Sequence, residues 1–180
     1  RGNERPATRV RIDRPFYLGR TEITNAQYGA VTDGTHHSGF ISWLSIDWRG
    51  EGHPLNGPNQ PVVRVSWQEA ERFCQALAAR TGRRVTLPTE AQWEWAARAG
   101  TAGWAWYGGP DDDFAACENL AGRELRTLAF SGKPKWFLRD DRFQDPWAVT
   151  APAGATRPNP WGLCDMLGNV REWTRSTYRS

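Results

Sequence analysis

LPTEAQWEWAAR, at residues 87–98, and GLCDMLGNVREW, at residues 162–173, are the stretches of sequence that decide the fold. The first has a marked helix start, because Thr89 is followed three residues later by Gln92. This is the spacing of a capping box, in which each residue satisfies a backbone N–H group of the other. Gly100 is expected to end this helix. The second stretch lies in a part of the chain without a convincing helix or long strand.

Two further capping boxes precede the first of these stretches. Thr24 and Ser66 are each followed three residues later by Gln or Glu, and each begins a predicted helix. Gly34 ends the first of these helices and Gly82 ends the second. The residues expected on apolar helix faces are Ala70, Phe73, Cys74 and Leu77 in the helix after Ser66, and Trp93, Ala96 and Ala97 in the helix after Thr89.

The other segments predict short strands and long loops. Polar and apolar residues alternate over Thr8–Phe16, and Pro61–Ser66 is a short extended run, so both are predicted as strands. Gly34–Pro61 has no sustained period but contains two tryptophans, which indicates a long ordered loop. Helices combined with short strands and loops predict a single α+β domain over residues 1–180.

The composition argues against several classes of partner. The 23 basic and 20 acidic residues give a net charge of +3, which is too balanced for a phosphate-binding surface. No apolar run approaches the length of a membrane-spanning helix. We therefore expect neither nucleic acid nor a membrane as a partner. Cys74, Cys117 and Cys164 are too widely spaced for a disulfide framework or a paired zinc motif, and the sequence does not indicate a compartment.

The two opening stretches together resemble the formylglycine-generating enzyme, or sulfatase-modifying factor, family. TEITN at 21–25, PVVRVSW at 61–67 and PNP at 158–160 support the resemblance and come in the family's usual order. The departures are modest: Thr86 stands where the family commonly has Arg, Arg171 replaces a common Trp, and the loop before Pro61 is expanded. The resemblance implies a C-type-lectin-like fold with short strands, two to three helices and long ordered loops.

The resemblance also implies a chemistry. The family's enzymes use copper and oxygen to convert a sulfatase cysteine to formylglycine, through two nearby cysteines whose soft thiolates select Cu(I). That pair lies downstream of the motif ending at Trp173, so we expect this domain to be C-terminally incomplete and completed by another segment or chain. None of the three cysteines present matches the pair, and no catalytic residue is assigned. Copper is expected only if such a pair exists elsewhere.

Two alternatives to the oxidase remain open. One is a noncatalytic lectin-like module that binds a protein or peptide ligand, since fold alone does not fix function. The weaker one is an iron-dependent relative using histidine ligands. His36, His37 and His53 are close in sequence, but adjacent histidines in an extended loop do not readily converge on one metal, so this alternative is disfavoured.

Calcium is the cofactor that the resemblance supports within this chain. Calcium prefers carboxylate and carbonyl oxygens on irregular backbone, which the last third of the sequence supplies. Turn capping by the same side chains is the competing interpretation. The implied ligands are Asn119, Leu120, Asp145 and Trp147 at a first site, and Asp165, Met166, Gly168 and Val170 at a second. In both sets only the Asn and Asp residues contribute side-chain oxygens.

Four glutamates in the motifs are interpreted as structural. Glu22, Glu90, Glu94 and Glu172 each lie at a helix start or beside a predicted core tryptophan. Capping and buried hydrogen bonds to loop backbone account for such positions. The sequence therefore predicts no catalytic carboxylate pair.

Overall fold

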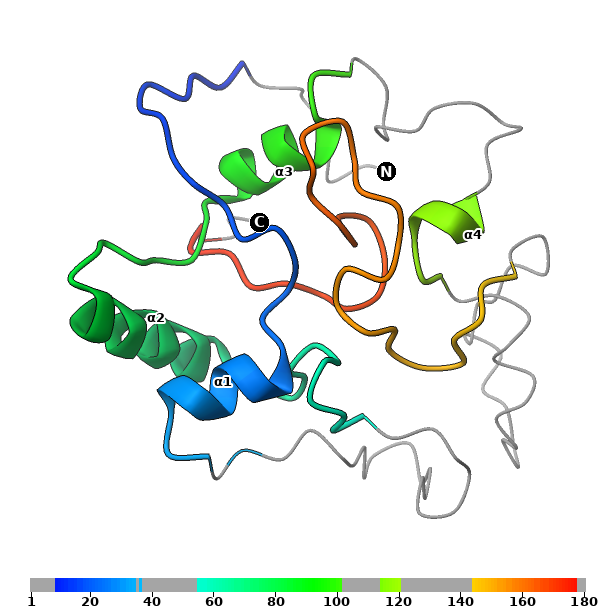
Figure 1. The fold of residues 1–180 in the computed structure, drawn as a ribbon. Coiled ribbons are helices and arrows are strands. Elements are labelled where there is room, and N and C mark those ends of the chain that lie inside the picture. The colour runs from blue at the N-terminus through cyan, green and yellow to red at the C-terminus, as the bar shows by residue number, and fades with distance from the viewer. Residues whose placement is uncertain (1–8, 35, 37–54, 102–113, 121–143, 178–180) are drawn as a thin grey trace.

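The computed structural model describes residues 9–34, 36, 55–101, 114–120 and 144–177. These ranges contain four helices, with bounds α1 Asn25–Val31, α2 Trp67–Thr81, α3 Glu90–Arg98 and α4 Phe114–Cys117. In Figure 1 the last described segment, coloured from yellow to red, loops past α3 and returns beside the N-terminal part of the chain.

All three predicted capping boxes are formed. At the start of α1, Thr24 Oγ1 accepts the Gln27 N–H (3.2 Å) and Gln27 Oε1 accepts the Thr24 N–H (3.0 Å). Reciprocal bonds of the same kind begin α2 at Ser66 and α3 at Thr89. Gly82 ends α2 with φ of 66°, a left-handed conformation that costs glycine little. Local sequence signals therefore fix these helix ends.

Two small hydrophobic clusters hold the helices in place. In the first, Tyr28 of α1 stacks on Phe73 of α2, with ring centroids 5.2 Å apart, and the buried Cys74 lies beside them. In the second, Ala96 and Ala97 of α3 pack against Met166. The predicted core role of Cys74 is confirmed, as is the shared face of Trp93, Ala96 and Ala97.

The predicted strands are the main correction to the fold. The described part of Thr8–Phe16 belongs to no ladder and bends at Arg14, so the strand expected there is not formed. In Pro61–Ser66 the pairing is limited to an isolated antiparallel bridge between Thr24 and Pro61, with the Val62 N–H bonded to the Ile23 carbonyl (2.9 Å). Arg64 has φ of 61°, which interrupts the extended conformation and prevents a continuous strand.

Two other expectations have different outcomes. The short helix α4 at Phe114–Cys117 was not predicted, because four residues are too few to show a helical period. Most of the predicted loop Gly34–Pro61 lies outside the described residues.

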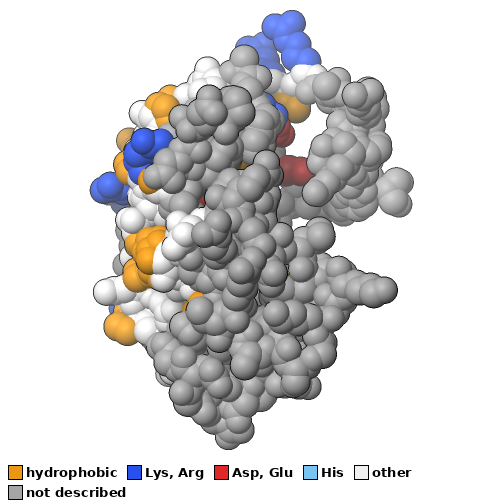
Figure 2. All heavy atoms as spheres, turned by 90° about the vertical axis from the view of Figure 1, so that its right-hand side faces the viewer, with side chains coloured by type: hydrophobic (Ala, Val, Ile, Leu, Met, Phe, Trp, Pro, Cys, Tyr) orange, Lys and Arg blue, Asp and Glu red, His pale blue; other side chains and the backbone are white. Residues whose placement is uncertain are grey.

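No helix in the described ranges is long and apolar enough to cross a membrane. On the face shown in Figure 2, basic side chains form separate groups with hydrophobic side chains between them.

Candidate functional site

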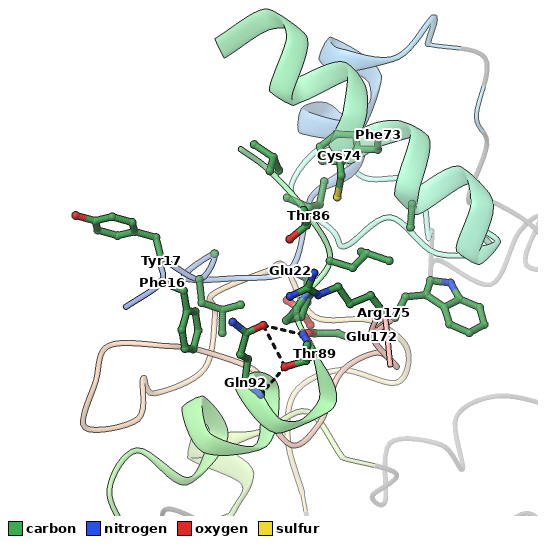
Figure 3. Close-up of a pocket in the computed structure, with 18 of the residues that line it drawn as sticks. Phe16, Tyr17, Glu22, Phe73, Cys74, Thr86, Thr89, Gln92, Glu172 and Arg175 are labelled. Carbon is green, nitrogen blue, oxygen red and sulfur yellow. Dashed lines mark hydrogen bonds between the residues drawn. The ribbon is translucent and has the colours of Figure 1, made fainter. Parts of the chain in front are cut away.

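A cleft of about 1400 Å³ opens between the N-terminal extended segment and the helices (Figure 3). Residues 10–19 form one wall, and α2 together with residues 83–88 forms another. Cys164 and Met166 of the second sequence motif line it from a third direction. The sequence segments expected to be merely architectural thus surround one shared space.

Glu22 is the buried acid of this cleft. Its residue is 8% exposed, and its Oε1 accepts a hydrogen bond from Asn169 Nδ2 (3.0 Å). Its Oε2 is buried without a hydrogen-bond partner. Burial, followed by the negative charges of Asp165 and Glu172, raises the pKa of Glu22 to about 8. The carboxyl group is therefore protonated at neutral pH.

Glu172 joins Glu22 at the cleft from the other end of the sequence (Figure 3). The residue as a whole is exposed, but its Oε2 accepts a hydrogen bond from the indole N–H of Trp93 (2.7 Å). Burial of the carboxyl group is the main cause that raises its pKa, and Asp165 adds to the rise. The interpretation of both glutamates as separate structural residues was thus incomplete, because they and Asp165 interact electrostatically.

The other two motif glutamates, Glu90 and Glu94, do not line the cleft. Glu94 pairs with Arg98 one turn later on the exposed side of α3 (2.7 Å), as a surface helix pair does. Glu90 lies in the first turn of α3, where an acidic residue is favourable to the helix dipole. Both have a place in the helix itself, although Glu94 makes an exposed ion pair and not the capping or buried hydrogen bond that was expected.

Asn169 is the hub that connects the motifs. Its Oδ1 accepts the Ala151 N–H (2.9 Å) and the Asn119 amide (3.0 Å). Its Nδ2 donates to Glu22 and to the Ala151 carbonyl (3.3 Å). Asn169 adopts φ of 59°, a left-handed conformation that asparagine tolerates better than most residues. One side chain therefore links the TEITN segment, the 144–151 segment and the GNVREW segment.

Asp145 brings together two other members of the first predicted calcium set, Leu120 and Trp147. Asp145 is 2% exposed and accepts the Leu120 N–H at Oδ2 (3.0 Å) and the Trp147 N–H at Oδ1 (2.9 Å). Asn119 donates from its amide to the Val149 carbonyl (2.6 Å). A buried carboxylate is a ligand that calcium prefers, whereas Leu120 and Trp147 turn their N–H groups, not their carbonyl oxygens, toward it. The same bonds are also what turn capping produces.

The second predicted set is centred on Asp165. Its Oδ2 accepts the Gly154 N–H (2.7 Å) and its Oδ1 accepts the Thr156 hydroxyl (2.6 Å). The remaining members of the set lie nearby in different surroundings: Met166 is buried in the α3 cluster, Gly168 packs against Asn119 and Glu118, and Val170 lines the cleft. In the described ranges, no three His, Cys, Asp or Glu side chains are arranged to hold one metal ion.

Gly168 has no room for a side chain. A Cβ there would lie 2.6 Å from the Asn119 carbonyl oxygen and 3.0 Å from the Glu118 Cβ. We expect Gly168→Ala to lower the free energy of unfolding by about 2 to 3 kcal/mol, the usual cost of overpacking against backbone. Urea denaturation measures this change. Gly29→Ala is the control, because nothing lies within 4 Å of its Cβ position; equal losses in both variants would contradict the packing argument.

The cysteines do not form the paired site that copper oxidation requires. Cys74, Cys117 and Cys164 are free and buried. Burial is the main cause that raises the pKa values of the Cys74 and Cys164 thiols, which disfavours the thiolate form that binds metal. Cys117 accepts a hydrogen bond from the Arg157 guanidinium (2.9 Å).

His36 also has a structural role. Its Nε2 lies 2.8 Å from the Val63 carbonyl oxygen, and its ring meets Tyr28 edge to face with centroids 5.3 Å apart. These contacts occupy the imidazole in core packing. The other two histidines considered for iron, His37 and His53, lie outside the described residues.

Comparisons with known proteins agree with this arrangement of motifs. Residues 1–180 match the sulfatase-modifying factor enzyme 1-like domain family. The formylglycine-generating enzyme of Streptomyces coelicolor is 32% identical over 207 residues, covering 94% of this chain and 60% of that protein. The inactive C-alpha-formylglycine-generating enzyme 2 of Bos taurus is 36% identical over 149 residues, covering 78% of this chain and 43% of that protein.

A solved structure gives the same result for the fold. PvdO from Pseudomonas aeruginosa superposes with a TM-score of 0.60 at 26% identity, covering 89% of this chain and 56% of that one. The chain spans about half the length of the proteins it matches. Since the match to the family extends over all 180 residues, the chain belongs to the sulfatase-modifying factor, or formylglycine-generating enzyme-like, family.

Proposed function

We propose that these 180 residues are the scaffold and cleft of a formylglycine-generating-type domain, and that they do not contain its oxidising centre. The observation that supports this is the state of the three cysteines, which are all buried and free. An oxidase of this family would need two neighbouring thiolates for copper. The cysteines described above do not fit that requirement, so no oxidation step is assigned to them.

Copper binding tests this proposal. Anaerobic Cu(I) titration against a chromogenic chelator is expected to show no site in the folded chain that competes with the chelator. The variant in which Cys74, Cys117 and Cys164 are replaced by alanine is expected to titrate identically. A stoichiometric Cu(I) site that disappears in this variant would show that the buried cysteines do bind copper, and would overturn the proposal.

We also propose that calcium is a structural ion of this domain, at one or both of the places centred on Asp145 and Asp165. The buried carboxylate of Asp145, which lies beside Leu120 and Trp147, supports the first place. The acids Asp165 and Glu172 support the second, because a nearby divalent cation would stabilise their negative charges. When bound, the ion would add cross-links between loop segments.

Removal of calcium is then expected to destabilise the fold. A ligand that binds only the native state stabilises it by RT ln(1 + [L]/Kd), so calcium at about 100 times its Kd adds about 2.7 kcal/mol. Differential scanning fluorimetry in EGTA and in excess calcium measures the shift in Tm, and magnesium is the control ion. An identical Tm in EGTA and in calcium would count against a structural calcium ion.

A noncatalytic binding module is the second candidate function. The Bos taurus relative named as inactive is 36% identical to this chain, and the Streptomyces coelicolor enzyme is 32% identical, so sequence identity does not separate the two functions. The open cleft favours a role in binding a protein or peptide. A neighbouring pair of cysteines in a longer form of this chain would favour the oxidase. A longer form without such a pair would favour the binding module.

A further inference from the structure

The two proposed calcium places touch each other through Asn119 and Asn169. Asn119 belongs to the first predicted calcium set, and Asn169 lies between two members of the second, Gly168 and Val170. The Asn169 N–H donates to the Asn119 carbonyl oxygen (2.8 Å), and the Asn119 side-chain amide donates to Asn169 Oδ1 (3.0 Å). The two residues are therefore joined through both backbone and side chains.

The segments that meet at this contact are tightly packed. A Cβ on Gly168 would lie 2.6 Å from the Asn119 carbonyl oxygen, so the backbone of the second place rests directly on that of the first. Asn169 Oδ1 also accepts the Ala151 N–H (2.9 Å), which belongs to the segment that follows Asp145. Movement of the backbone around Asn169 would therefore move both segments of the first place.

The same contact orients a ligand atom of the first place. Asn119 Nδ2 donates to the Val149 carbonyl (2.6 Å) as well as to Asn169, and a carbonyl oxygen can only accept. This fixes which end of the amide is the nitrogen. Asn119 Oδ1 accepts no hydrogen bond from the part of the chain that the structure describes. A side-chain oxygen of a residue that is 7% exposed is thus available to a hard cation such as calcium.

The geometry favours positive coupling between the two places. Asp145 and Asp165 are each 2% exposed, so each place has its own carboxylate to offset the charge of an ion. An ion at the second place would hold the backbone on both sides of Asn169, the residue that orients Asn119. The ion that binds later would find its ligands already ordered and would cost the chain less conformational entropy.

We infer that calcium binding at the two places is coupled through the Asn119–Asn169 pair, so that occupation of one place raises the affinity of the other. This inference rests on the proposed calcium function and deepens it, because it requires both places to bind. Coupling between two sites typically changes affinity by about 5- to 150-fold, equally in both directions. The domain would then pass from calcium-free to fully loaded over a narrow range of calcium concentration.

Isothermal titration calorimetry of the calcium-free chain with calcium tests the coupling. Asp145→Asn removes the charged ligand of the first place and Asp165→Asn that of the second, so each variant reports the affinity of the place that remains. The overall association constant for two ions in the parent, divided by the product of these two affinities, is the coupling factor. It is expected to be at least about 5. Circular dichroism checks that each variant is folded, and the parent alone gives a second measure, because coupled places fill over a narrower calcium range than independent ones.

Asn169→Gly tests the pair itself. Glycine keeps the left-handed backbone (φ of 59°) and the N–H that bonds to the Asn119 carbonyl, but it removes the side-chain bond to the Asn119 amide. The coupling factor, measured in the same way, is expected to fall toward about 1. Asn25→Gly is the matched control: it removes three hydrogen bonds from an asparagine amide to loop carbonyls outside both places, and is expected to leave the coupling factor unchanged.

The possible results separate the coupling from calcium binding itself. A coupling factor of about 1 or below, or a single ion bound per chain, would overturn the inference and leave the calcium proposal standing. A coupling factor that Asn169→Gly does not reduce would also overturn the inference, since the coupling would not pass through this pair. No calcium binding at all would contradict the calcium proposal as well.

Discussion

Raising the pH from about 5 to about 9 is expected to destabilise the calcium-free chain, and Glu22→Gln is expected to remove most of this loss. The pKa of Glu22 is about 8 in the folded state, against 4.5 for an ordinary glutamate. Below 4.5 the group is protonated in both states. Between 4.5 and 8 the unfolded chain releases its proton while the folded chain keeps it, so stability falls as the pH rises.

The size of this effect follows from the shift. Each pKa unit corresponds to about 1.36 kcal/mol, so the full loss amounts to about 5 kcal/mol above pH 8. Glu22→Gln keeps the oxygen that accepts from Asn169 but leaves its new amide donor without a partner at the position of Oε2, which costs about 1 to 3 kcal/mol. At pH 9 the variant is therefore expected to be about 2 to 4 kcal/mol more stable than the parent.

Urea denaturation in EGTA across this pH range measures both quantities. Glu94→Gln is the control, because Glu94 lies in an exposed pair with Arg98 and its loss is expected to change stability by less than about 0.5 kcal/mol. Stability that increases through this pH range in the parent would contradict the prediction. A variant with the parent's pH dependence would show that Glu22 is not the group responsible.

Asn169→Ala is expected to destabilise the chain by about 3 to 5 kcal/mol. The substitution removes four hydrogen bonds that join three separate segments, and leaves the Ala151 N–H and the Asn119 amide each with one bond fewer. It also places alanine at φ of 59°, a left-handed conformation that alanine tolerates less well than asparagine does.

Thermal denaturation followed by circular dichroism measures this loss, and two control variants divide it. Asn169→Gly accepts the left-handed backbone, so its loss reports the hydrogen bonds alone. Arg171→Ala, an exposed neighbour, is expected to remain within about 0.5 kcal/mol of the parent. A loss below about 1 kcal/mol in Asn169→Ala would contradict the role of this residue as a hub.

Local signals in the sequence account for the helices of this fold. The capping boxes at Thr24, Ser66 and Thr89 place the starts of α1, α2 and α3 because both partners of each box lie within four residues. The end of α2 at Gly82 was predictable for the same reason, because a glycine just after a helix is itself a local signal for its end. The isolated extended run at Pro61–Ser66 was predicted as a strand because its sequence does not show that Arg64 adopts a left-handed backbone.

The site depends on contacts that no local pattern contains. Glu22 and Glu172 are 150 residues apart in sequence, so their shared cleft becomes visible only in the folded chain. One long-range grouping was nevertheless expected: the resemblance to the family placed Leu120, Asp145 and Trp147 together, and hydrogen bonds join them in the structure. Their role as calcium ligands remains a prediction.

A scaffold without an oxidising centre does not produce formylglycine. The most direct test is a turnover assay in which the purified chain, Cu(I) and oxygen are incubated with a peptide that carries a sulfatase cysteine, and formylglycine is measured by mass spectrometry. The formylglycine-generating enzyme of Streptomyces coelicolor is the positive control. We expect no formylglycine above the copper-only background; repeated turnover by this chain would show that its 180 residues do contain an oxidising centre.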